Sequence, residues 1–121
     1  MKEIRLTTPL SGELMTTVRL TTGGVCSVAG LSMDDSEDCK VCVTESLLLL
    51  MHRGYNAAQI AFTVENGLGV EIEGQNKTER ESAGQEDEIS AAILCALAEN
   101  AVLEKKDGEL CRITFRFGLQ A

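Results

Sequence analysis

The side chains whose types and spacing could do chemistry gather in one stretch of the chain, from Cys39 to Tyr55. Cys39 and Cys42 have the spacing of a redox or zinc motif, and His52 is the only histidine of the sequence. Because the stretch has helical periodicity and no second Cys/His pair stands at metal-binding spacing, we expect both cysteines to pack as small buried hydrophobes. His52 could be a ligand or a base, but near a helix end it more often caps the last carbonyl groups. The same packing role is expected of three cysteines on apolar faces, Cys26, Cys95 and Cys111.

Length and composition indicate one acidic domain. The chain has 121 residues, of which 11 are basic and 19 acidic, for a net charge of −8, and 44% are hydrophobic. These values are ordinary for a single globular domain of about 100 to 150 residues. The negative charge would repel phosphate backbones and anionic lipid headgroups, so we expect no nucleic-acid or membrane partner and favour proteins or cations.

The cysteine count and the first residues favour the cytoplasm. Five cysteines is an odd number, and residues 1–8 lack the basic-then-apolar layout of a secretory signal. The longest apolar run, Leu47 to Met51, is far shorter than the roughly 20 residues that span a bilayer. We therefore expect a cytoplasmic protein with reduced thiols, and the apolar run is expected to lie in the core rather than to mark a groove.

The first half of the sequence predicts a strand and two helices. Residues 2–8 alternate between apolar and polar, which is typical of a strand. Ser11 is a candidate N-cap for a helix that ends near Gly30, and the pair Gly23-Gly24 predicts a kink or close packing within it. The capping box of residues 32–35 predicts the start of a second helix, which Gly54 ends. The inner face of the first helix is predicted to hold Leu14, Val18, Val25, Val28 and Ala29.

The second half predicts two hairpins with a helix between them. Residues 60–64 and 68–72 alternate on either side of Asn66-Gly67, a tight-turn sequence. Residues 75–85 are polar and predict a mobile loop, and 86–98 predict a helix. Its inner side is predicted to hold Ile89, Ile93, Leu94, Leu97 and Ala98. The last hairpin turns at Lys106-Asp107-Gly108. One face of its second strand is predicted to hold Cys111, Ile113, Phe115 and Phe117.

The order of these elements predicts the fold class. The order is β-α-α-β-β-α-β-β, and every strand is apolar on one face only, so helices must cover one side of a sheet. We expect an α/β (α+β) fold, a two-layer sandwich in which a mixed, mostly antiparallel five-stranded sheet carries three helices on one face.

Several stretches together resemble a known family. Residues 4–73 are similar in order and spacing, and residues 86–117 in element pattern, to the anti-sigma-factor serine kinases of bacteria, which are histidine-kinase-like ATPases with the Bergerat fold. The resemblance implies a single ATPase domain over residues 1–121. The residues that carry it are Val18 to Thr21, Ala29 to Asp35, Glu37 to Val41, Val43 to Ser46, and Gly54-Tyr55.

The resemblance implies an ATP site with Mg²⁺, but this sequence departs from the pattern. The family places a Glu as general base and, four residues later, an Asn that holds the metal; Glu45 matches the Glu, whereas Leu49 offers no oxygen. We therefore expect Glu45 to be a helix residue rather than a base, no metal site, and Leu49 to fill the nucleotide cavity. The family's histidine is displaced as well, because Arg53 occupies its position and His52 lies one residue earlier.

Two further nucleotide elements are missing. The adenine-binding Asp and its glycines are replaced by Glu73-Gly74-Gln75-Asn76-Lys77. The second glycine box is replaced by Gln85-Glu86-Asp87-Glu88, whose three carboxylates would oppose a triphosphate, although they suit a helix start.

Two functions remain open. The favoured one is an anti-sigma-factor-like regulatory protein that acts by protein–protein binding and has a degenerate ATP site, with no cofactor. The resemblance then implies a sigma factor and an anti-sigma-factor antagonist as partners, and a homodimer. The alternative is an ATP-dependent serine/threonine protein kinase that phosphorylates the antagonist, with Glu45 as base, Asn76 and Lys77 on the nucleotide, and Mg²⁺.

Overall fold

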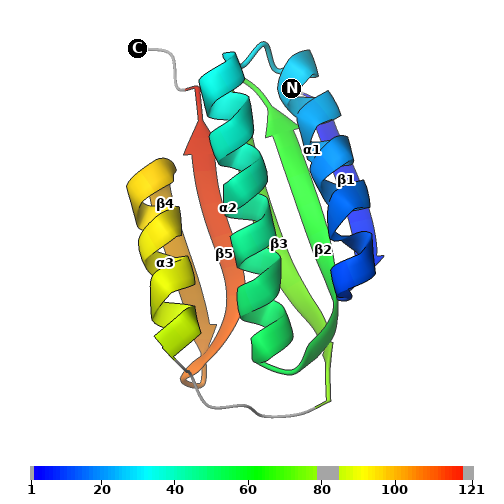
Figure 1. The fold of residues 1–121 in the computed structure, drawn as a ribbon, viewed down its shortest axis with the longest axis vertical. Helices are drawn as coiled ribbons and strands as arrows, with labels where there is room; N and C mark the ends of the chain where they lie inside the picture. Colours follow the sequence, from blue (N-terminus) through cyan, green and yellow to red (C-terminus); the bar gives the residue numbers. More distant parts are fainter. Residues whose placement is uncertain (1, 79–84, 119–121) are drawn as a thin grey trace.

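A computed structural model describes residues 2–78 and 85–118, and over this range the order of elements is the expected one. Figure 1 shows the arrangement. The elements are β1 (Lys2–Pro9), a 3₁₀ turn (Gly12–Leu14), α1 (Met15–Val28), α2 (Met33–His52), β2 (Tyr55–Val64), β3 (Leu68–Lys77), α3 (Gln85–Leu97), β4 (Glu99–Lys106) and β5 (Glu109–Phe117). No helix in this part of the chain is long and apolar enough to cross a bilayer.

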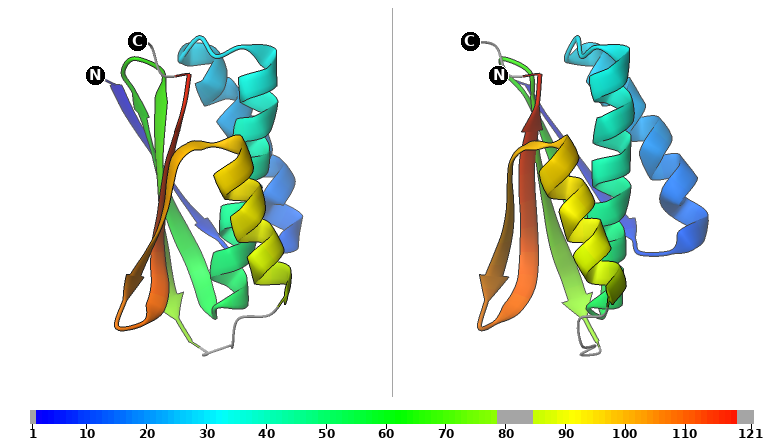
Figure 2. Two further views of the ribbon diagram at one scale, coloured as in Figure 1. Left: turned by 90° about the vertical axis from the view of Figure 1, so that its left-hand side faces the viewer. Right: turned by 60° about the vertical axis from the view of Figure 1, so that its left-hand side comes forward.

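The five strands form one sheet in the order β1-β2-β3-β5-β4. All four neighbouring pairs are antiparallel, so the sheet of the described residues contains no parallel pair where a mixed one was expected. All three helices cover one face, and the other face is open (Figure 2). The predicted two-layer α/β sandwich is thereby confirmed.

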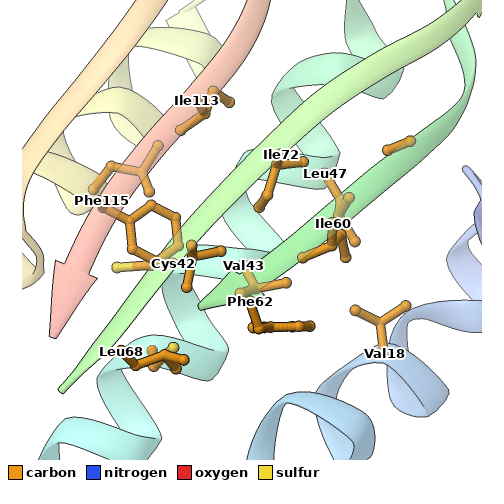
Figure 3. Packing of buried hydrophobic residues seen from close by; sticks show 14 of the residues in the cluster. Val18, Cys42, Val43, Leu47, Ile60, Phe62, Leu68, Ile72, Ile113 and Phe115 are labelled. Atoms are coloured by element: carbon orange, nitrogen blue, oxygen red, sulfur yellow. The ribbon is translucent and has the colours of Figure 1, made fainter. Parts of the chain in front are cut away.

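The core lies between the sheet and α2, and it follows from the alternation of the strands. Ile60 and Phe62 on β2, with Ile72 on β3, are fully buried and point toward Val43 and Leu47 of α2 (Figure 3). Successive strand residues point to opposite faces, so every second residue reaches this layer. The side of the central helix that faces the sheet is therefore covered by apolar side chains, and Leu47, Leu49 and Leu50 of its apolar run are buried.

Both tight turns form as predicted. Asn66 and Gly67 have φ of 51° and 104°, and Asp107 and Gly108 have φ of 55° and 78°. At the second turn Lys106 pairs with Glu109, so Asp107 and Gly108 form a two-residue type I′ turn, whose twist matches that of paired antiparallel strands. At the first turn Val64 pairs with Leu68, so the loop has three residues. Local turn chemistry thus fixes the register of two hairpins.

The two predicted N-caps have different outcomes. Ser32 Oγ accepts a hydrogen bond from the Asp35 amide at 3.1 Å, as predicted for α2. Ser11 makes no such bond, because it precedes the short 3₁₀ turn and α1 begins only at Met15. Gly23 shows the predicted close packing, since a β-carbon there would lie 2.9 Å from the Lys40 side chain of α2.

Some predicted faces are wrong. Val28 is 58% exposed, because the buried stripe of α1 runs through Val18, Thr22, Val25 and Cys26, and Val28 lies well around the helix from it. Cys95 is exposed rather than packed. Cys111 is only half-buried, since a register shift between β4 and β5 turns the neighbouring Leu110 inward instead.

The strands of the first hairpin are longer than predicted. β2 begins at Tyr55 and β3 runs to Lys77, so Gln75 to Lys77 belong to a strand and not to a loop, and Gln75 and Lys77 pair with Ala57 and Tyr55. Of the loop predicted over 75–85, residues 79–84 lie outside the described residues, and 85 already belongs to α3.

Candidate functional site

The side chains singled out around Glu45 face α3 across a narrow contact between two helices. On α2, residues 45, 49, 52 and 53 recur at helical spacing and so share one face of that helix. The facing helix α3 lies alongside α2 over the sheet (Figure 1). We call this contact the α2–α3 seam and define it by Glu45, Leu49, His52 and Arg53 of α2 with Asp87 and Ser90 of α3.

Asp87 is the charged centre of the seam. Its side chain is only 7% exposed, and its Oδ2 lies 3.2 Å from Arg53 Nε in an ion pair. Its Oδ1 lies 3.1 Å from His52 Nδ1. A carboxylate can only accept, so Nδ1 carries the proton in this contact. The ion pair is not aligned as a hydrogen bond, and the described residues give neither Nε nor Oδ2 a hydrogen-bond partner, so each depends on the charge of the other.

These contacts change the interpretation of two predicted residues. His52 was expected to cap the carbonyl groups at the end of α2, whereas its hydrogen bond in the structure joins α2 to α3. Of the three carboxylates expected at the start of α3, Asp87 is buried in the seam and Glu88 is exposed; the side chain of Glu86 lies outside the described residues. Ile89, predicted to face inward, is 55% exposed because Asp87, Ser90 and Leu94 occupy the inner stripe.

Glu45 has a partner in the same seam. Ser90 Oγ donates a hydrogen bond to Glu45 Oε2 at 2.7 Å, and Ser90 is buried. The hydroxyl therefore satisfies one oxygen of the residue that matches the family's general base. The charge of Glu45 is half-buried between the helices rather than presented to open solvent.

Leu49 lies between the two polar contacts and is 2% exposed. It borders a pocket of about 170 Å³ that is lined by both apolar and charged residues. The other lining residues are Arg53, Asp87, Glu88, Ala91, Leu103, Lys105 and Leu110. A leucine side chain has no oxygen for a metal, and the described residues contain no group of three or more His, Cys, Asp or Glu side chains that could hold one.

Tyr55 closes the end of β3, where the family's adenine contact would be. A β-carbon at Gly74 would lie 2.7 Å from the Tyr55 ring, so the ring occupies the space above this glycine. The Tyr55 hydroxyl donates to the Leu110 carbonyl at 2.7 Å, and burial raises the pKa of the phenol. The sheet is thus covered at this end by an aromatic ring of its own.

Lys77 lies beside this ring, and neither Asn76 nor Lys77 belongs to the seam. Lys77 pairs with Glu109, and its ammonium nitrogen is 5.1 Å from the centre of the Tyr55 ring. Asn76 is exposed with a left-handed φ of 56°. The ion pair joins the ends of β3 and β5, so the Lys77 charge already has a structural partner.

Ser90, and the roles of Arg53 and Tyr55, were not found by sequence reasoning. The signal was present in α3, where Asp87 and Ser90 stand three residues apart on the side that Leu94 shows to be inward. Polar residues in an inward stripe predict polar partners on the facing helix.

Comparison with known proteins supports the resemblance over part of the chain. Two proteins named serine-protein kinase RsbW, from Staphylococcus aureus strains RF122 and MRSA252, are each 36% identical to this chain over 67 residues. The match covers 55% of this chain but only 38% of the length of those relatives. No family model matches. The predicted similarity to serine kinases of this type is confirmed within that span.

Proposed function

We propose that this chain, a partial-length relative of the RsbW serine-protein kinases, is an anti-sigma-factor-like regulatory protein that acts by binding other proteins and no longer binds ATP. The observation that carries the proposal is the closed α2–α3 seam. Glu45 is bonded to Ser90, Asp87 is held by Arg53 and His52, and Leu49 is buried between them.

The chemistry of the seam does not fit a magnesium nucleotide. Mg²⁺ requires oxygen ligands in an octahedron and usually bridges phosphate oxygens, yet the position of the expected ligand is a buried leucine. Asp87 adds a buried carboxylate at the start of α3, where the family would offer backbone amides to the phosphates, and its charge would repel them. The cation beside it, Arg53, is already in an ion pair with Asp87 and is not free to bind a phosphate.

The adenine end of the site gives independent support. Tyr55 covers Gly74 and donates to the Leu110 carbonyl of β5, and Lys77, one of the two residues that a divergent nucleotide site would use, is paired with Glu109. Opening this end would break the Tyr55 hydrogen bond and the ion pair together. The proposed loss of ATP binding therefore rests on two separate places in the fold.

A protein-binding role is supported by the outer face of α1. Leu20 and Val28 are 73% and 58% exposed, and Gly24 stands between them at the same four-residue spacing. Side chains four residues apart share a helix face, so α1 presents apolar surface that no described residue covers. We propose a sigma factor as the partner on this face, with an anti-sigma-factor antagonist as competitor and a homodimer as the acting form.

Co-purification from the native host with mass spectrometry tests this function. A sigma factor should be recovered with the chain, and its binding should be unchanged by addition of magnesium and ATP. Leu20→Asp should weaken the binding at least tenfold, whereas Ile89→Asp, an equally apolar exposed position on α3, should leave it unchanged. Recovery of the chain without any sigma factor, or an equal loss of sigma-factor binding in both variants, would refute the proposed role.

The alternative function is a serine/threonine protein kinase with Glu45 as the base. It is favoured by the kinase activity that the name of the relatives gives them and by the retained glutamate. Labelled ATP and a candidate antagonist protein test it directly. Phosphate transfer that Glu45→Gln abolishes and Ser90→Ala preserves would establish the kinase. Glu45→Gln keeps an acceptor for the seam hydrogen bond but removes the base, whereas Ser90→Ala removes the hydrogen bond and leaves the base in place.

A further inference from the structure

A small pocket lies between the end of α2, the first turns of α3 and the β4–β5 hairpin. It is the pocket of about 170 Å³ that Leu49 borders. Helix α3 contacts both α2 and β4, and Figure 1 shows it in front of that strand. The proposed regulatory function assigns no ligand to this pocket. Its apolar lining is Leu49, Ala91, Leu103 and Leu110, and its charged lining is Arg53, Asp87, Glu88 and Lys105.

Two buried polar atoms of the lining residues make no hydrogen bond within the described part of the chain. They are Asp87 Oδ2 and Arg53 Nε, which lie 3.2 Å apart in an ion pair that is not aligned as a hydrogen bond. The other carboxylate oxygen of Asp87 is already bonded to His52. Buried donors and acceptors without hydrogen bonds cost free energy. A ligand that accepts from Nε and donates to Oδ2 would therefore satisfy both atoms while the ion pair stays in place.

The charges of the lining indicate that such a ligand is neutral. Arg53 and Lys105 supply two positive charges, and Asp87 and Glu88 supply two negative ones. An anion placed between Arg53 and Asp87 would be repelled by the carboxylate, and a cation would be repelled by the guanidinium. A neutral group with a donor and an acceptor on one carbon atom avoids both repulsions and matches the two atoms that lack hydrogen bonds. The carboxamide group has this pattern.

The volume and the apolar lining limit the rest of the ligand. A cavity of about 150 Å³ lined by apolar side chains is large enough to bind benzene. The pocket of about 170 Å³ therefore admits one six-membered ring beside its three leucine side chains. Pockets for drug-sized ligands usually measure about 300 to 1,000 Å³, so a nucleoside phosphate is too large for this one.

We propose that this pocket is a binding site for a small neutral carboxamide carried on an aromatic or heteroaromatic ring. The amide N–H donates to Asp87 Oδ2, and the amide oxygen accepts from Arg53 Nε. The ring packs against Leu49, Leu103 and Leu110. A ligand bound in this way contacts α2, α3 and the β4–β5 hairpin together, so it stabilises the folded chain.

Nuclear magnetic resonance titration of the isotope-labelled full chain with three probes of one shape tests the proposal. Benzamide is neutral, benzoate is an anion and benzamidine is a cation, and the three have the same number of non-hydrogen atoms. Benzamide should shift the backbone amide signals of Ala91 and Leu103 saturably, with a Kd of about 1 mM or below. Benzoate and benzamidine should bind at least about tenfold more weakly, because each meets one like charge in the Arg53–Asp87 pair. Benzamide should also raise Tm as its concentration increases.

Two leucine substitutions on neighbouring residues of α3 locate the binding. Ala91→Leu places a larger side chain in the pocket and leaves the ion pair untouched, so it should abolish benzamide binding. Ala92→Leu is the matched control, because Ala92 is exposed, and it should leave the Kd unchanged. Circular dichroism checks that each variant is folded, and the three probes on the unsubstituted chain are decisive without the variants.

Four results would overturn the proposal. Benzamide could give no saturable shift at ten times the expected Kd, which would mean that water alone satisfies the two buried atoms. The three probes could bind equally well, the shifted signals could lie away from the pocket, or folded Ala91→Leu could bind benzamide as tightly as the unsubstituted chain.

Discussion

Replacing Asp87 by alanine should destabilise the protein far more than its place on a polar helix start suggests. The change leaves the Arg53 guanidinium, only 19% exposed, without the carboxylate 3.2 Å away, and it removes the acceptor of His52. Breaking a fully buried ion pair costs about 4 kcal/mol, and the part of Arg53 that water still reaches reduces this to about 3 kcal/mol. Total stabilities of such domains are about 5–15 kcal/mol, so the loss is a large fraction.

Urea unfolding followed by circular dichroism measures the change. With an m-value of about 2 kcal/mol/M, a loss of about 3 kcal/mol lowers the midpoint by about 1.5 M. Glu88→Ala is the matched control, because Glu88 is the next residue in the same first turn but is exposed. It should lose only its interaction with the helix dipole, about 0.5 kcal/mol. Equal effects of the two substitutions would refute the buried ion pair.

Four further substitutions and one titration test other parts of the structure. Leu49→Ala should lower the free energy of unfolding by about 3 kcal/mol, because it leaves a cavity at a 2% exposed position; a change below about 1 kcal/mol in urea unfolding would show that the site is open. Tyr55→Phe should lose about 1 kcal/mol with its hydrogen bond. Tyr55 is the only tyrosine, so absorbance titration of the wild type should show its ionisation above pH 10. Because the pKa of Tyr55 is raised in the folded state, the stability of the protein is retained below that pH and falls as pH rises through the folded pKa. Ionisation of Tyr55 at or below pH 10 would contradict its burial. Ser32→Ala should lower Tm through a loss of about 1 kcal/mol, whereas Ser11→Ala should have no measurable effect; equal shifts in thermal unfolding would contradict the assigned caps.

The parts of the fold that depend on local chemistry could be predicted from the sequence. Asn66-Gly67 and Asp107-Gly108 favour positive φ on their own, and the Ser32 cap depends on an amide three residues away. Strand alternation then orients the apolar faces without knowledge of the partners. The sequence alone also reveals the departure of Leu49 from the family's pattern, because that pattern requires an asparagine four residues after the glutamate and this chain has a leucine there.

The partners in the seam could not be predicted, because they are distant in the chain. The spacing of Asp87 and Ser90 puts them on the side of α3 that holds Leu94, but it does not identify Arg53 and Glu45 of α2, about 35 and 45 positions earlier, as their partners. The fit of the Tyr55 ring over Gly74 likewise depends on the pairing of β2 with β3. Contacts of this kind are tertiary and leave little trace in local patterns.

Titration calorimetry of the purified full chain with ATP in excess magnesium tests the central claim most directly. The buried Leu49, the Asp87 charge and the covered Gly74 predict no saturable heat at micromolar protein and nucleotide concentrations. Saturable binding with a micromolar Kd would contradict the account.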